Sequence, residues 1–260
     1  MLVICLLLIT IPLTATKYAG EIFALSPGVL SSAMGATGLT YENNFSAGWW
    51  NPALLSIIPE NGMELMRCEH FEGLMAQNQL SIILGSNTKT SFTLNHLAID
   101  KIKLTKLENP NDSLSNENRP IVWKTVSNQD FILSAGIARK VGKTLSLGIS
   151  PKLAYRTLAE NSGYAFGADL GMLWQISNKA RLGMNLRDFF STQVLWEGGE
   201  YETVIPNLDL ELGYNFTPIK KIPVHLAWRS EILLENREAT VEAGDLSADF
   251  HAGIAVQPIS

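Results

Sequence analysis

Residues 164–176 read Tyr-Ala-Phe-Gly-Ala-Asp-Leu-Gly-Met-Leu-Trp-Gln-Ile. Every second residue from Tyr164 to Ile176 is apolar, whereas the residues between them are mostly small or polar, including Gly167 and Asp169. Such alternation is typical of a β-strand with one apolar face. About ten residues is also the length that a tilted strand needs to cross a bilayer. The stretch therefore predicts a membrane-crossing β-strand.

The same alternation recurs along the chain beyond residue 60. Residues 145–156 and 246–257 repeat it clearly. Weaker copies lie at residues 62–71, 76–84, 91–99, 129–140, 180–189, 207–216 and 223–232. Together these segments predict an all-β chain of about ten antiparallel transmembrane strands.

The connections between these strands alternate in length. Short turns are expected at residues 85–87, 141–143, 177–179 and 217–219, and longer polar loops at residues 101–124, 191–203 and 235–244. Short periplasmic turns on one rim and longer extracellular loops on the other are typical of outer-membrane barrels. Residues 108–119, rich in Asn, Ser, Asp and Glu, are expected to form the main extracellular excursion.

Composition excludes several other classes. The chain has 260 residues, of which 46% are hydrophobic and 17% charged, and its formal net charge is −5. It is too apolar for a disordered chain and too acidic for a protein that binds nucleic acid by neutralising phosphates. Two cysteines are too few for a disulfide framework. No apolar run in the body of the chain reaches the ~18 residues of a spanning helix, so a membrane β-barrel fits best.

A soluble β-sandwich or a lipocalin-like barrel would also have alternating strands. In such a protein the large apolar residues point inward and the outer face carries many Lys and Glu. Here the less apolar face carries Gly and Ala, which suit a crowded interior. Aromatic residues also gather near the expected strand ends, as at Tyr155, Tyr164, Trp174 and Tyr214, where membrane girdles would lie. We therefore prefer the membrane barrel.

The N-terminus predicts export. Residues 2–13 are almost entirely apolar and are followed by three small residues before Lys17. This pattern indicates a signal peptide over residues 1–16. The alternative, a buried first helix, is disfavoured by Pro12. Removal of residues 1–16 leaves Cys68 as the single cysteine, so no intramolecular disulfide is expected.

A motif lies between the signal peptide and the first strand. It comprises Tyr-Ala-Gly-Glu at 18–21, Ser-Ala-Met-Gly-Ala-Thr-Gly-Leu at 32–39 and Ser-Ala-Gly-Trp-Trp-Asn-Pro-Ala-Leu-Leu at 46–55. With these residues the chain resembles the PorV/PorQ family of outer-membrane proteins and, more distantly, the FadL/TodX-type transporters of hydrophobic compounds. In those families a Met-Gly-Gly-Ala-like stretch precedes an aromatic residue and Asn-Pro-Ala-Gly-Leu. This chain departs from the pattern at Ala36 and Leu54.

The resemblance implies that residues 17–60 form a plug or hatch inside a barrel made by residues 61–260. Glycines permit a sharp turn or a close backbone approach, and Asn51 followed by Pro52 can begin a short helix. The plug could be a fixed filling of the lumen or a moving gate, and the sequence leaves both open. The expected plug residues are Gly35, Gly38, Trp49, Trp50, Asn51 and Pro52.

Barrels of these families have about fourteen strands, an even number like other outer-membrane barrels. An open sheet cannot sit in lipid with unpaired edges. With about ten strands found by alternation, we expect that C-terminal strands are missing from this sequence and that it is a fragment.

Charged residues fall on the less apolar face of the expected strands. Most should be paired across strands, because a charge in a narrow lumen is costly unless it is matched or hydrated. A role in selectivity for some of them stays open. The lumen-facing candidates are Lys152, Arg156, Asp169, Arg187 and Arg229.

No enzymatic chemistry is expected. Nucleophile elbows, phosphate loops and His-Glu-x-x-His motifs are absent, and the four histidines have no metal-ligand spacing. We therefore predict no catalytic residues, no metal and no cofactor.

Two functions remain, both in the outer membrane of a Gram-negative-type bacterium. The PorV/PorQ resemblance favours a role in type IX protein secretion or cargo docking, with exported proteins or secretion-machine subunits as partners beside the membrane lipid. The alternative is FadL-like transport of small hydrophobic compounds. An apolar pocket behind Trp49 and Trp50 would favour transport, and an exposed patch on the long loops would favour docking. A nonspecific porin ranks third, since the plug would occlude its pore.

Overall fold

The computed structural model describes residues 20–25, 27–219, 222–235 and 237–257, so the predicted signal peptide lies outside the described residues. Helices occur almost entirely before residue 60. They are α1 (Glu21–Ala24), α2 (Val29–Ala33), α3 (Ala47–Trp50) and two 3₁₀ helices, η1 (Pro52–Ser56) and η2 (Phe71–Gly73). No helix within the described residues has both the length and the apolar character that a membrane span requires.

The rest of the chain is built of antiparallel strands, as expected. They are β1 (Gly62–His70), β2 (Met75–Leu84), β3 (Thr90–Leu107), β4 (Pro120–Val141), β5 (Leu145–Leu158), β6 (Asn161–Gln175), β7 (Ala180–Arg187), β8 (Gln193–Trp196), β9 (Tyr201–Thr203), β10 (Asn207–Ile219), β11 (Ile222–Leu233), β12 (Val241–Ala243) and β13 (Leu246–Val256). The ten strands expected from alternation are all present. The short strands β8, β9 and β12 lie in segments that were expected to be polar loops, which alternation over three or four residues cannot reveal.

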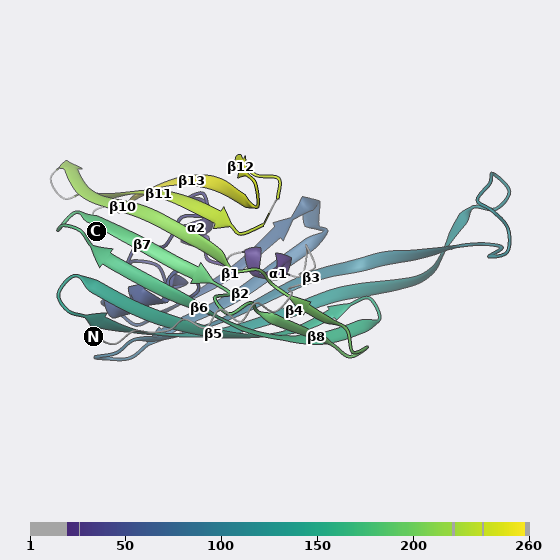
Figure 1. Cartoon of the computed structure of the whole chain (residues 1–260), viewed down its shortest axis with the longest axis horizontal. Coiled ribbons are helices and arrows are strands. Elements are labelled where there is room, and N and C mark those ends of the chain that lie inside the picture. The colour runs from purple at the N-terminus through teal and green to yellow at the C-terminus, as the bar shows by residue number, and fades with distance from the viewer. Residues whose placement is uncertain (1–19, 26, 220–221, 236, 258–260) are drawn as a thin grey trace.

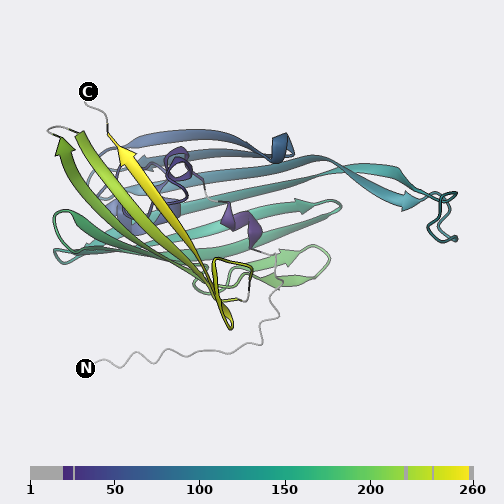
Figure 2. The same ribbon diagram turned by 90° about the horizontal axis from the view of Figure 1, so that it is seen from above.

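All the strands belong to one 13-stranded sheet. Its order is β1-β2-β3-β4-β5-β6-β7-β10-β11-β13-β12, and β8 pairs with β6 and β9. The sheet curves around the N-terminal helices (Figures 1 and 2). Within the described residues β1 pairs with neither β12 nor β13, so the sheet forms a wall that is not closed.

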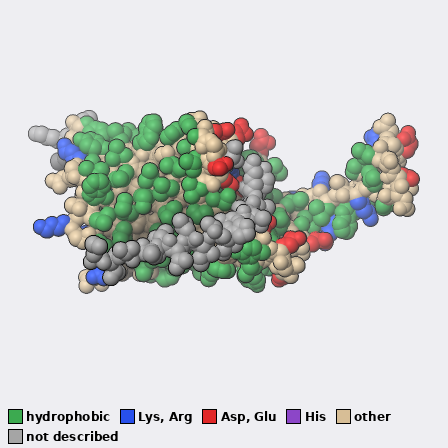
Figure 3. All heavy atoms as spheres, viewed as in Figure 1, with side chains coloured by type: hydrophobic (Ala, Val, Ile, Leu, Met, Phe, Trp, Pro, Cys, Tyr) green, Lys and Arg blue, Asp and Glu red, His purple; other side chains and the backbone are tan. Residues whose placement is uncertain are grey.

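The outer face of the sheet is apolar. Residues directly opposite each other in an antiparallel pair share a face, so the register defines rows of side chains across the strands. One row runs across six strands through Leu65, Leu80, Leu94, Leu133, Leu153 and Phe166. Leu65 is 66% exposed and Leu153 61% exposed. Hydrophobic side chains also cover the body of the molecule in Figure 3, while charged ones concentrate at its ends and along a projecting ribbon.

Aromatic residues lie near both ends of this apolar face. Tyr155 and Tyr164 are opposite each other on β5 and β6, with ring centroids 5.2 Å apart. Trp174 and Tyr214 lie near the other ends of β6 and β10, and all four rings are exposed. Apolar rows bounded by aromatic residues match the lipid-facing surface of a barrel.

The expected loop at residues 101–124 is mostly strand. Strands β3 and β4 continue to Leu107 and from Pro120, and project as a two-stranded ribbon far beyond the other strands (Figure 1). Only residues 108–119 form its tip. The register shifts twice along the ribbon, between Ile99 and Ile102 and between Leu104 and Thr105. Such bulges reverse the alternation of faces, which is why the sequence pattern did not show these strands.

Candidate functional site

The segment 20–58 lies against the inner face of the sheet, and its residues are the centre of the hydrophobic core. Trp49 and Trp50 are buried, as are Leu39, Leu54 and Leu55. We call residues 20–58 the plug. The plug and the charged inner face of the wall form the candidate site.

The side chain of Asn51 connects two segments of the plug with each other and with a strand of the wall. Its Oδ1 accepts the backbone N–H of Ala53 at 3.1 Å, which makes Asn51 the N-cap of η1 with Pro52 as the first residue of that helix. Its Nδ2 donates to the carbonyl of Leu39 at 2.9 Å and to that of Met172 on β6 at 3.0 Å. This one side chain therefore fixes two plug segments against a strand.

Glycines on the inner face allow this contact. A Cβ on Gly171 of β6 would lie 2.3 Å from Asn51 Oδ1. In the plug itself Gly35 has a φ of +65°, a left-handed conformation that glycine adopts without strain. A larger residue at Gly171 would displace the capping side chain.

Glu211 of β10 holds a turn of the plug. Its buried carboxylate accepts the backbone N–H groups of Gly38, Leu39 and Thr40 at 2.8, 3.0 and 2.9 Å. It also accepts the Thr40 hydroxyl at 2.6 Å. The alternation of residues along β10 puts Glu211 on the inner face, but the sequence gives no sign that its partners are three successive backbone amides of the plug.

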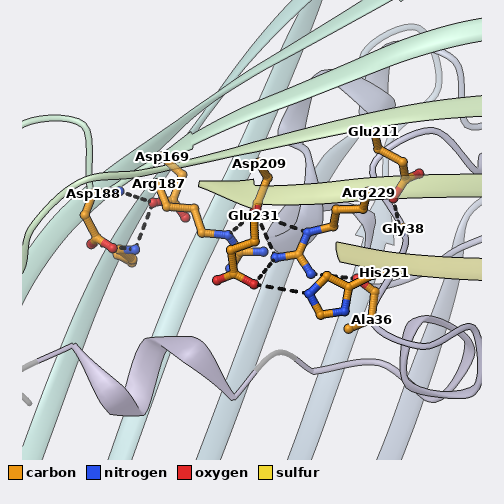
Figure 4. Close-up of polar contacts among 11 residues, drawn as sticks. Ala36, Gly38, Asp169, Arg187, Asp188, Asp209, Glu211, Arg229, Glu231 and His251 are labelled. Carbon is orange, nitrogen blue, oxygen red and sulfur yellow. Dashed lines mark hydrogen bonds and ion pairs between the residues drawn. The ribbon is translucent and has the colours of Figure 1, made fainter. Parts of the chain in front are cut away.

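Two arginines of the wall lie against Trp50. The guanidinium carbons of Arg187 and Arg229 lie 5.4 and 5.3 Å from its ring centroid. Asp209 between them accepts from Arg187 Nε at 2.5 Å and from Arg229 Nη2 at 2.6 Å. Arg229 Nη1 also donates to the carbonyl of Ala36 at 2.7 Å, so the same cation ties the wall to the plug (Figure 4).

The other lumen-facing candidates are also paired. Lys152 Nζ lies 2.8 Å from Asp169 and 2.7 Å from Asp188, and 4.7 Å from the ring centroid of Phe23 in α1. Arg156 Nε donates to Asp130 Oδ1 at 2.9 Å. The structure therefore brings Asp169 together with Lys152, and Arg187 with Arg229, whereas Arg156 forms a separate pair nearer the ribbon.

A cavity of about 320 Å³ opens between α1 and the wall beside the ribbon. Polar groups reach it from Glu21, Asn128, Asp130 and Arg156. Its apolar lining is Ile22, Leu25, Phe71, Met75, Leu97, Ile99 and Leu158. We call it the rim pocket. An apolar pocket behind Trp49 and Trp50 would have favoured transport, but the guanidinium groups of Arg187 and Arg229 lie against the ring of Trp50, so its surroundings on that side are charged.

At the opposite end of the plug, Glu42 forms an ion pair with Arg181 of β7. Burial alone would raise the pKa of Glu42, but the hydrogen bond and the charge of Arg181 outweigh burial and hold this pKa below its usual value. In the described part of the chain, no three His, Cys, Asp or Glu side chains are grouped to hold a metal.

The chain is similar to several solved structures. A TodX monoaromatic hydrocarbon channel with a deltaS2S3 mutation has 14% identity and a TM-score of 0.48, over 88% of this chain and 74% of that one. A deltaS2 mutant of the same channel has 12% identity and a TM-score of 0.48, over 89% and 78%. In-vitro-folded OmpT, an outer membrane protein of Vibrio cholerae, has 11% identity and a TM-score of 0.39, over 88% and 73%. No protein-family model matches the chain. No curated protein matches it either.

Proposed function

We propose that this chain is an outer-membrane β-barrel protein that takes up small hydrophobic molecules through the rim pocket, with the plug closing the interior beneath. The rim pocket is the observation that carries this proposal. It combines an apolar lining with the Asp130–Arg156 ion pair, the Glu21 carboxylate and the Asn128 amide, and its size is within the range of about 300–1,000 Å³ that small-molecule sites occupy.

The arrangement of polar and apolar residues supports a place in the membrane. The outer face carries continuous apolar rows with aromatic residues near both ends, and the inner face carries buried, paired charges. A soluble protein has the reverse arrangement, because water solvates charges and excludes apolar surface. The longest connection, residues 108–119, lies at the ribbon end, which makes that end the extracellular one.

The position of α1 supports uptake rather than storage. Ile22 and Leu25 form one side of the rim pocket, and Phe23 of the same helix lies against Lys152 in the charged interior. A shift of α1 would therefore connect the rim pocket with the lumen, whereas the tightly bound residues 36–56 could stay in place.

The test is binding of naphthalene to the purified, folded chain, followed by its fluorescence. Ile99→Trp places a large side chain in the rim pocket and should weaken binding at least about tenfold, because the ligand volume is lost. Ile121→Trp is the matched control, since Ile121 is exposed on the ribbon away from the pocket. Unchanged binding in Ile99→Trp, or equal loss in both variants, would contradict the proposal.

A second candidate function is docking of exported proteins, which the resemblance to PorV/PorQ in residues 18–55 implies. One observation favours it: the ribbon exposes Leu114, Ile121, Val122 and Trp123 far from the apolar face. Native mass spectrometry of the chain extracted from its own outer membrane would test it. A stoichiometric protein partner that is lost from a Trp123→Ala variant supports docking, and a lipid-sized ligand without protein partners supports transport.

A further inference from the structure

The outer face of β1–β4 carries a chain of hydrogen-bonded polar side chains next to the leucine row. Arg67 Nη1 donates to Asn78 Oδ1 at 2.9 Å, and Asn78 Nδ2 lies 3.3 Å from His96 Nδ1. His96 Nε2 lies 2.6 Å from Gln129 Oε1. The chain of contacts therefore crosses four strands on a face that is otherwise apolar.

The register places this polar chain at the level of the aromatic residues. Arg67, Asn78 and His96 are directly opposite one another on β1, β2 and β3. The same row continues through Phe131, Tyr155 and Tyr164 on β4–β6. Aromatic girdles lie at the level of the lipid headgroups, so the polar chain lies at that level too.

Two lysines lie next to this row of hydrogen-bonded side chains, on its ribbon side and at the base of the ribbon. Lys103 is opposite Thr125, which by alternation along β4 shares the outer face with Gln129. Lys101 lies in the bulge after Asp100, whose Oδ1 accepts from Gln129 Nε2 at 3.3 Å. Among the described residues, neither lysine side chain has a hydrogen bond or an ion pair, and both residues are exposed.

We propose that this surface binds the phosphate groups of the phosphorylated glycolipid in the outer leaflet. Exposed ammonium groups at headgroup level attract anionic lipid, and guanidinium and amide N–H groups donate to phosphate oxygens. The adjacent leucine row gives the acyl chains an apolar surface. The headgroup patch consists of Arg67, Asn78, His96, Lys101, Lys103 and Gln129.

The acids that are hydrogen-bonded within the headgroup patch are fewer than its cations. Glu69 pairs with Arg67 at 2.9 Å and Asp100 binds Gln129, against the three cations Arg67, Lys101 and Lys103. The inference rests on the outer-membrane placement proposed above, and not on transport. Naphthalene binding therefore reports separately on the rim pocket when the headgroup patch is changed.

The experiment measures binding of bisphosphorylated lipid A to the purified full chain by native mass spectrometry. A variant with Arg67→Gln, Lys101→Gln and Lys103→Gln should lose about fivefold in affinity per charge removed. The control carries Arg139→Gln, Lys140→Gln and Lys143→Gln, which removes three exposed charges at the opposite end of β4 and β5. Its lipid A binding should not change.

Three results would overturn the inference. They are equal binding of dephosphorylated lipid A, equal loss in the two triple variants, and tighter binding of phosphatidylglycerol than of lipid A, which would point to an inner-leaflet phospholipid. The single variant Lys103→Gln removes one unpaired surface charge, so it keeps the test available if the triple variant does not fold. It should weaken lipid A binding about fivefold.

Discussion

The two halves of the plug are held against the wall in different ways. Residues 36–56 are fixed by directional, buried contacts from Glu211, Arg229 and Asn51. Residues 20–25, which include α1, are held by packing of Ile22 and Phe23 and by a surface ion pair between Glu21 and Arg237, and the Leu25 carbonyl accepts two longer bonds of 3.3 Å from Gln77 and Asn95. Buried hydrogen bonds specify one position, whereas apolar packing tolerates small shifts. The comparison indicates that, if part of the plug moves, α1 is the part that moves.

Removing the Glu211 carboxylate should have the largest effect. Glu211→Ala leaves three buried N–H groups of the plug without an acceptor, which should cost about 3–5 kcal/mol in the free energy of unfolding. Urea unfolding followed by tryptophan fluorescence measures this. Glu211→Gln keeps one acceptor oxygen and should lose less. A wild-type unfolding midpoint in Glu211→Ala would show that residues 36–56 are not held as described.

Removing the Asn51 side chain should cost about 2–3 kcal/mol. Asn51→Ala loses an N-cap and two hydrogen bonds to buried carbonyls. Asn111→Ala at the exposed tip of the ribbon is the matched control and should leave the unfolding midpoint unchanged. If the two variants have the same unfolding midpoint, the contacts of Asn51 do not stabilise the plug against the wall.

A larger residue at Gly171, opposite the Asn51 side chain, should lower the free energy of unfolding somewhat less than Asn51→Ala does. A methyl group at Gly171 would overlap Asn51 Oδ1, so Gly171→Ala should destabilise by about 1–3 kcal/mol. Gly198→Ala is the control, because nothing lies within 4 Å of a Cβ at that position. A neutral Gly171→Ala would mean that η1 can shift away from β6 at little cost.

The α1 half should respond weakly to loss of a polar contact. Glu21 pairs with Arg237 at the surface, and Glu21→Gln should change the free energy of unfolding by less than about 0.5 kcal/mol.

Hydrogen exchange compares the two segments directly. The backbone amides of residues 38–40 should exchange more than about tenfold slower than those of α1. Equal protection in the two segments would remove the basis for assigning movement to α1.

Lowering the pH should reduce the stability of the folded chain through protonation of Glu42 in the plug. Because the pKa of Glu42 is lowered in the folded chain, its pair with Arg181 contributes stability above the ordinary carboxyl pKa. That contribution is lost as the pH falls through the folded pKa. Glu42→Gln should therefore be slightly less stable than wild type at neutral pH and should match it in strong acid. A constant difference over the whole pH range would contradict this assignment.

The sequence predicted the wall better than the interior. Alternation located every long strand, and it placed Lys152, Arg187 and Arg229 on the inner face, because the side-chain period of a strand fixes which face each residue occupies. It could not show the ribbon, where bulges reverse the faces. Nor could it pair Glu211 with residues 38–40, since the path of the plug across the sheet depends on packing and not on local pattern.

The long reach of the plug contacts has a consequence for the order of folding. The hydrogen bonds from Gly38 to Glu211 and from Arg229 to Ala36 join residues 173 and 193 positions apart. During synthesis these plug residues are therefore made long before their binding partners on β10 and β11. Contacts that close such long loops form late and slowly. Residues 36–40 can therefore form their hydrogen bonds to the wall only after the strands up to β11 have paired. A correctly bound plug would then indicate that these strands are in register.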